Sequence, residues 1–185
     1  MKLRLATCDD APAIAALHTH SWRHTYHEAL SAAYLRDVVP GDRAAIWQQR
    51  LASPKDSQRV LVADVDGAVG GFACTYLDEH AEWGSYLDNL HVDPAYRGLG
   101  YGRALLAGIA QLCARQATRR GLYLLVLQNN LSAQRFYLGL GAHNAQAAVW
   151  QAPDGSAAPA YWFRWETTTT LAQQWPLVAD VELAC

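Results

Sequence analysis

The residues best suited to chemistry lie in a short glycine-rich loop that carries two arginines. Arg97, Gly98, Gly100, Gly102 and Arg103 follow a short apolar strand and open an apolar helix. Glycines let backbone N–H groups approach an anion closely, and the following helix presents the positive end of its dipole. The arginines add charge-assisted hydrogen bonds. This combination favours a pyrophosphate as the ligand.

Three kinds of phosphate-binding loop compete for this segment. A Walker loop ends in Gly-Lys-Ser/Thr, whereas this loop continues with Gly102, Arg103 and Ala104. The dinucleotide fingerprint needs glycine where Arg103 stands, and an acidic residue about 20 positions further on, and the sequence has neither. The third kind holds the pyrophosphate of coenzyme A. A turn that binds nothing would leave the two arginines unexplained.

This segment resembles the acyl-CoA-binding motif of the GNAT superfamily of N-acetyltransferases, Arg/Gln-x-x-Gly-x-Gly/Ala, through Arg97, Gly100 and Gly102. A second resemblance lies downstream. Asn130 and Tyr137 stand where the family's Asn-x-x-Ala-x-x-x-Tyr helix has them, with alanine between them at the matching position. The resemblance spans about residues 3–166, and residues 90–141 carry its specific part.

The resemblance implies a direct transfer of acetyl from acetyl-CoA to a primary amine of a small molecule or peptide. It assigns coenzyme binding to the backbone of Leu90 and Val92, to the loop that runs from Arg97 to Arg103, and to Asn130. It also implies that Tyr137 lies beside the thioester sulfur and protonates the departing thiolate. A coenzyme A-binding regulatory domain and a transferase for a longer acyl-CoA are the alternatives.

A carboxylate that accepts the amine proton is harder to identify. Asp88 precedes Val92 by four in one predicted strand, so the two share a face if no bulge intervenes. The family's carboxylate commonly lies further upstream, so a solvated Asp88 and deprotonation by water stay open. His91 and Glu82 are lesser candidates, and alternation predicts that His91 faces away from Asp88.

Aromatic residues of the first helix are candidates for the acceptor pocket. Trp22, Tyr26 and His24 combine apolar surface with polar atoms, although Trp22 could equally pack the helix onto the sheet. The seven histidines show no metal-ligand spacing, so no metal is expected.

The elements that position these residues follow from periodicity and turn signals. Strands are predicted over residues 2–6, 60–65, 68–77, 84–92, 122–127, 142–151 and 159–167. A first helix is predicted to start near Pro12, and a second helical stretch is predicted to stop at Pro40. Three more helices are predicted: one over residues 42–51, one from the glycine loop to about residue 119, and one over residues 130–140. This order is that of a mixed α/β sheet with helices on both faces. The family resemblance adds a mostly antiparallel sheet and a splayed fourth strand.

Composition bounds the remaining properties. The 185 residues suit one domain, 1–185, although residues 168–185 have no assigned structure. A net charge of −2 argues against a nucleic-acid partner, and no apolar run approaches the roughly 20 residues of a membrane span. Four scattered cysteines are typical of free thiols in the cytoplasm. The apolar segment of Trp175 to Val178 is compatible with a homodimer.

Overall fold

The computed structural model describes residues 1–173, which form one seven-stranded sheet in the order β1-β2-β3-β4-β5-β7-β6. Every neighbouring pair is antiparallel except β4 and β5, which are parallel. The predicted mixed, mostly antiparallel sheet is confirmed. The strands are β1 (Lys2–Leu5), β2 (Gln58–Val65), β3 (Ala68–His80), β4 (Gly84–Val92), β5 (Leu122–Leu127), β6 (His143–Gln151) and β7 (Ala157–Trp165).

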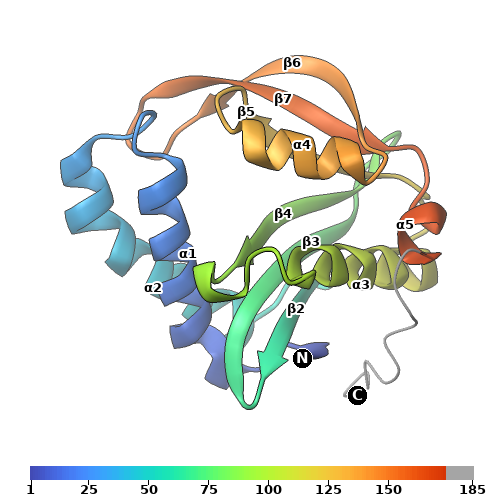
Figure 1. Ribbon diagram of the computed structural model, residues 1–185, viewed down its shortest axis with the longest axis horizontal. Coiled ribbons are helices and arrows are strands. Elements are labelled where there is room, and N and C mark those ends of the chain that lie inside the picture. Colours follow the sequence, from blue (N-terminus) through green and yellow to red (C-terminus); the bar gives the residue numbers. More distant parts are fainter. Residues whose placement is uncertain (174–185) are drawn as a thin grey trace.

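Helices cover both faces of this sheet, as predicted. They are α1 (Ala11–Thr25), α2 (Val39–Ala52), α3 (Tyr101–Gln116), α4 (Leu131–Gly139) and α5 (Thr169–Gln173). On one face α3 buries Leu105 and Ile109 against the sheet, and on the other α1 and α2 bury Ile14 and Trp47 against Phe72. In Figure 1, β2 to β4 run through the lower part of the molecule and β5 to β7 through the upper part, with α4 beneath them.

The prediction that a helix stops at Pro40 is wrong. A π-helical turn at Tyr34–Val38 leads directly into α2, and Pro40 occupies the first turn of that helix. Proline is tolerated there because the first N–H groups of a helix have no intrahelical acceptor. The segment after residue 167, for which no element was predicted, contains α5. Residues 175–178, and with them the argument for a homodimer, lie outside the described residues.

Cys8, Cys74 and Cys113 are free thiols. Within residues 1–173, each helix is too short or too polar to cross a membrane.

Strands β4 and β5 separate soon after they start. Across the described residues they pair at Ser85 with Leu122 and at Tyr86 with Tyr123, and nowhere beyond. Gly84 and Gly121 allow the two backbones to approach closely at this junction. A Cβ on Gly121, for example, would lie 2.3 Å from the carbonyl oxygen of Trp83. Since both strands continue past this point, the predicted splay of the fourth strand is confirmed.

A bulge also interrupts β4. Leu87 pairs with Thr75 of β3, but Asn89 pairs with the next residue back, Cys74, so Asp88 has no partner in the register. An extra residue in one strand of an antiparallel pair bends that strand and breaks the alternation of its side chains. Simple alternation therefore does not predict on which face of the sheet the side chains of residues 88–92 lie.

The first testable prediction concerns the junction of β4 and β5. Gly121→Ala is expected to lower the free energy of unfolding by at least about 2 kcal/mol, because a Cβ 2.3 Å from a backbone oxygen forces the strands apart. Urea unfolding measures the change. Gly41→Ala is the matched control, since nothing lies within 4 Å of its added Cβ, and it is expected to be neutral or to stabilise by up to about 1 kcal/mol. Equal unfolding midpoints for the two variants would contradict the role given to the junction.

Candidate active site

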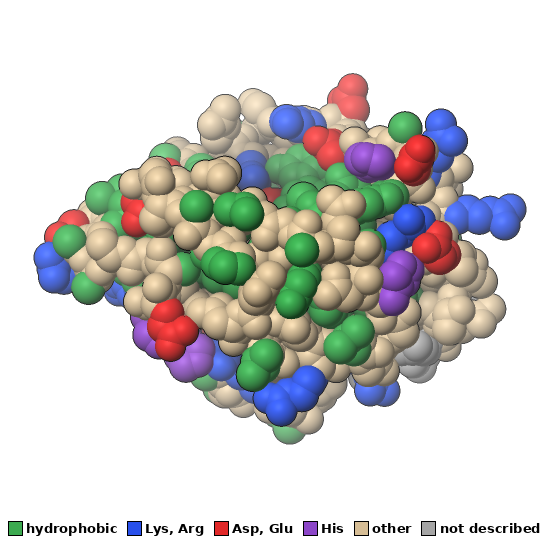
Figure 2. All heavy atoms as spheres, turned by 90° about the horizontal axis from the view of Figure 1, so that it is seen from above, with side chains coloured by type: hydrophobic (Ala, Val, Ile, Leu, Met, Phe, Trp, Pro, Cys, Tyr) green, Lys and Arg blue, Asp and Glu red, His purple; other side chains and the backbone are tan. Residues whose placement is uncertain are grey.

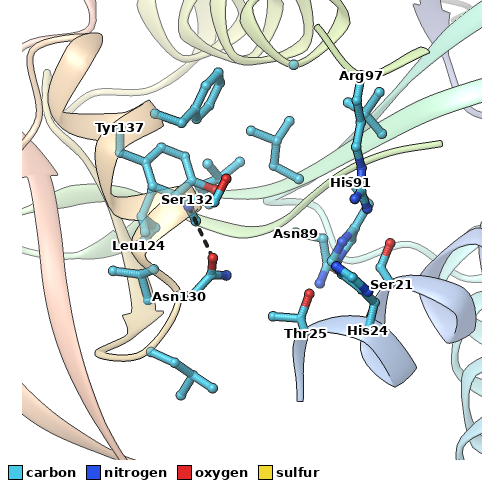
Figure 3. A pocket seen from close by; sticks show the side chains of 18 of the residues that line it. Ser21, His24, Thr25, Asn89, His91, Arg97, Leu124, Asn130, Ser132 and Tyr137 are labelled. Carbon is cyan, nitrogen blue, oxygen red and sulfur yellow. Dashed lines mark hydrogen bonds between the residues drawn. The ribbon is translucent and has the colours of Figure 1, made fainter. Parts of the chain in front are cut away.

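The separation of β4 and β5 opens a cavity of about 780 Å³. Its walls come from both strands, from the end of α1, from the loop before α3 and from the start of α4. In Figure 3, Tyr137, Ser132 and Asn130 occupy one wall, and Arg97, His91 and Asn89 face them with residues of α1. All the residues predicted to bind coenzyme line this cavity: Leu90, Val92, Arg97, Gly98, Gly100, Gly102, Arg103, Asn130 and Tyr137.

The glycines of the loop differ in backbone conformation and in surroundings. Gly98 and Gly100 have φ values of 77° and 87°, a backbone conformation that residues with a Cβ rarely adopt. Gly100 is the N-cap of α3. Gly102 has no such constraint, since a Cβ there would meet the ring of Phe136 in α4 at 3.4 Å, an ordinary van der Waals distance. The loop thus sets the positive end of α3 at the cavity, next to the exposed side chains of Arg97 and Arg103.

Asn130 has one structural task already. It is the N-cap of α4, and its side-chain oxygen accepts a hydrogen bond of 3.1 Å from the backbone N–H of Ala133 (dashed in Figure 3). An amide has two N–H bonds in addition to this oxygen. Because Asn130 lines the cavity, its amide group can donate into it.

Tyr137 lies on α4 and is buried, with its ring edge-on to Trp165 at 6.0 Å. Burial raises the pKa of the Tyr137 phenol above its ordinary value, and the nearby Tyr26 adds a smaller effect in the same direction. The phenol is therefore protonated at neutral pH, and the side chain faces the cavity as a hydrogen-bond donor.

Asp88 faces the α1 and α2 side of the sheet. Its carboxylate accepts a hydrogen bond of 2.7 Å from Arg50 of α2, and the ring of His91 lies 4.8 Å from that of His18 in α1. Val92, in contrast, packs against the core beside α3. The expectations that Asp88 shares a face with Val92 and that His91 points away from Asp88 are both wrong, because the bulge shifts the alternation by one residue. Glu82 is exposed in the turn before β4, outside the cavity.

A smaller cavity of about 130 Å³ adjoins the first. Trp22 lines it and packs against Leu35 of the π-helical turn and Val39 of α2. Tyr26 lines both cavities, and burial and the charge of Asp88 raise the pKa of its phenol to about 12.

Sequence reasoning missed several lining residues of this smaller cavity, above all His18, Arg43, Arg50 and Trp150. Arg43 and Arg50 stand seven positions apart on α2, a spacing that places both on one helix face and could have revealed them. Trp150 comes from β6, far away in the sequence. Nothing in its neighbourhood in the chain indicates that it meets α1.

The two histidines beside the cavities are neutral. Burial is the largest cause that lowers the pKa of His91 to about 4, and burial also lowers the pKa of His18 well below its ordinary value. Residues 1–173 contain no group of three or more His, Cys, Asp and Glu side chains that could hold a metal ion.

The comparisons with known proteins agree with this geometry. The model of the acetyltransferase (GNAT) family matches residues 14–142. The uncharacterised N-acetyltransferase YuaI of Bacillus subtilis is 32% identical over 108 residues, which are 57% of this chain and 60% of that relative.

Solved structures share the fold at lower identity. Ribosomal-protein-alanine N-acetyltransferase from Brucella melitensis is 23% identical with a TM-score of 0.67, and the match covers 89% of this chain and 99% of that one. The structure of yncA from Salmonella typhimurium with its cofactor acetyl-CoA is 22% identical with a TM-score of 0.63, over 89% and 92% of the two chains. The chain belongs to the GNAT acetyltransferase family.

Proposed function

We propose that this protein transfers the acetyl group of acetyl-CoA to the primary amine of a small molecule or peptide. The observation that carries the proposal is the cavity between β4 and β5. The glycine loop, the start of α3, Asn130 and the phenol of Tyr137 all line it, although they come from separate parts of the chain. The yncA structure, which holds acetyl-CoA in the same fold, supports the choice of donor.

The two ends of the coenzyme need different surroundings, and the cavity offers both. The pyrophosphate would lie at the positive end of α3, with Arg97 and Arg103 beside it. The pantetheine arm carries amide groups, and β4 has an edge suited to them. Among the described residues, β5 pairs with β4 no further than Tyr86, so backbone groups near Leu90 and Val92 are open to a ligand on that side.

The chemistry requires no covalent intermediate with the protein. The amine nitrogen attacks the thioester carbon, the carbon–sulfur bond breaks, and the amine loses one proton while the sulfur gains one. Positioning of the two substrates supplies much of the rate. Tyr137 donates its hydroxyl hydrogen toward the departing sulfur. Since a phenol is a weaker acid than a thiol, the hydrogen bond to the developing thiolate is its main contribution, and solvent then completes the proton balance.

Asp88 is the proposed acceptor of the amine proton, directly or through one water. It lines both cavities, so its carboxylate lies between the proposed positions of the donor and the acceptor. The ion pair with Arg50 fixes the orientation of that carboxylate. Trp22 and Tyr26 would hold the acceptor on the side away from the coenzyme.

The second testable prediction concerns the coenzyme. Acetyl-CoA at about 100 times its Kd should stabilise the protein by about 2.7 kcal/mol, a rise in melting temperature of roughly 5–10 °C. Gly100→Asp should abolish this shift, because a carboxylate would stand where the phosphates bind. Gly155→Asp is the matched control, since Gly155 has the same φ of 87° but lies outside the cavity. A normal shift in Gly100→Asp would remove the loop from the binding site.

The third prediction separates binding from chemistry at Tyr137. Tyr137→Phe removes one hydroxyl group and keeps the ring, so the melting temperature and the shift with acetyl-CoA should both survive. Turnover, measured as thiol release with an accepted amine, should fall about a hundredfold or more. Wild-type turnover in this variant would return Tyr137 to a purely structural role.

The fourth prediction tests Asp88 as the proton acceptor. Asp88→Asn should lower the rate of the chemical step most at low pH, where the acceptor is mostly ammonium. The defect should shrink as the pH rises toward the pKa of the amine, because solvent then supplies the neutral nucleophile. Single-turnover rates across pH measure this dependence.

Loss of the ion pair alone needs its own control. Arg50→Met breaks the pair with Asp88 and keeps the carboxylate, so its rate defect should be smaller and independent of pH. If Asp88→Asn and Arg50→Met show the same pH-independent defect, Asp88 serves only to hold the structure.

A further inference from the structure

The smaller cavity has a charge pattern that bears on the acceptor. It shares Tyr26, Asp88 and Asn89 with the larger cavity, so a molecule bound in it adjoins the proposed thioester position. Two guanidinium groups, those of Arg43 and Arg50, line this small space together with one carboxylate, that of Asp88. The charged lining is therefore positive by one.

Arg43 is held in place but retains bonding capacity. It is buried, its guanidinium lies 4.2 Å from the centre of the Trp22 ring, and its Nε donates to Asp42 at 3.1 Å. Its Nη2 also bonds that carboxylate, and both of these hydrogen bonds leave Nη1 unused within the described residues. Asp42 is absent from the lining, so the positive charge is presented to the cavity and the balancing carboxylate is not.

His18 provides a second donor. Its Nδ1 accepts a hydrogen bond of 2.9 Å from the indole Nε1 of Trp47, which can only donate. A neutral His18 must then carry its proton on Nε2. That atom is buried and has no hydrogen-bond partner within the described residues. A buried donor without an acceptor costs free energy, and a ligand oxygen in the small cavity would remove that cost.

We infer that the amine acceptor also carries a carboxylate, which binds in the small cavity between Arg43 and the Nε2–H of His18. This inference rests on the proposed transfer to an amine, and it names the class of acceptor: a small amino acid or another short amino carboxylate. The carboxylate has the acceptor oxygens that these donors lack, and its charge offsets the excess of guanidinium groups.

The same features disfavour a polyamine. The face of Trp22 that could attract an ammonium group already carries the guanidinium of Arg43. A second cation next to Arg43 and Arg50 would meet like charge in a space of about 130 Å³. A cavity of this size suits a carboxylate and a few further atoms.

Calorimetry on the protein loaded with coenzyme A tests the inference. The probes are the common amino acids, each paired with its own carboxamide, which keeps the amine and the side chain but lacks the negative charge. At least one acid should bind ten times more tightly than its amide or better. No binding of any acid, or equal affinity of acid and amide in every pair, would overturn the anion site.

Substitutions of Arg43 test where the carboxylate of the acceptor binds. Arg43→Met should reduce the preference for the acid to less than threefold, and Arg43→Lys, which keeps the charge and is safer for folding, should retain part of it. Arg36→Met is the matched control, since Arg36 is exposed, pairs with Asp37 and lines neither cavity. A full preference in both Arg43 variants would place the anion elsewhere.

Thiol release from acetyl-CoA with the same panel separates this inference from the proposed function. If acids bind selectively but none is acetylated, the proposed transfer fails and the anion site stands. If neutral amines or polyamines are acetylated with no preference for acids, the transfer stands and the anion site fails.

Discussion

Strands β4 and β5 are hydrogen-bonded at their first residues and then part, and the candidate site depends on this separation. Gly121 permits the close approach of the two backbones at the junction. Beyond Tyr86, within the described residues, β4 has lost its neighbour on that side. A sheet edge exposed inside a protein offers unpaired N–H and C=O groups to a ligand. The cavity, its backbone lining and the approach of α3 to it all follow from this one break in pairing.

The bulge at Asp88 adds a second consequence. A regular strand would place Asp88 with Val92 on the side of α3. The extra residue turns it toward α2 instead, where Arg50 binds it. The carboxylate thereby stands where the two cavities meet. One irregularity in the strand thus joins the proposed coenzyme site to the smaller cavity, where two arginines and one aspartate are the charged lining residues. Within the described residues, the Nε2 of His18 and the Nη1 of Arg43 make no hydrogen bond there.

Local chemistry explains which features could be predicted from the sequence. The conformation of Gly100 and the capping role of Asn130 depend on their own neighbours in the chain, so the loop and the starts of α3 and α4 could be predicted. The bulge at Asp88 depends on the register of β3, and Trp150 meets α1 only through the folded sheet. Figure 2, a view from above Figure 1, shows hydrophobic side chains gathered in a hollow of the surface, with charged side chains near them.

The central claim is that acetyl-CoA lies between β4 and β5 with its phosphates at the start of α3. Residue-resolved amide exchange, measured by NMR with and without acetyl-CoA, tests it most directly. The account predicts slower exchange at two separate places, the loop from Gly98 to Arg103 and the open edge of β4 around Leu90 and Val92. Protection spread evenly over the molecule, or confined to residues outside the cavity, would contradict it.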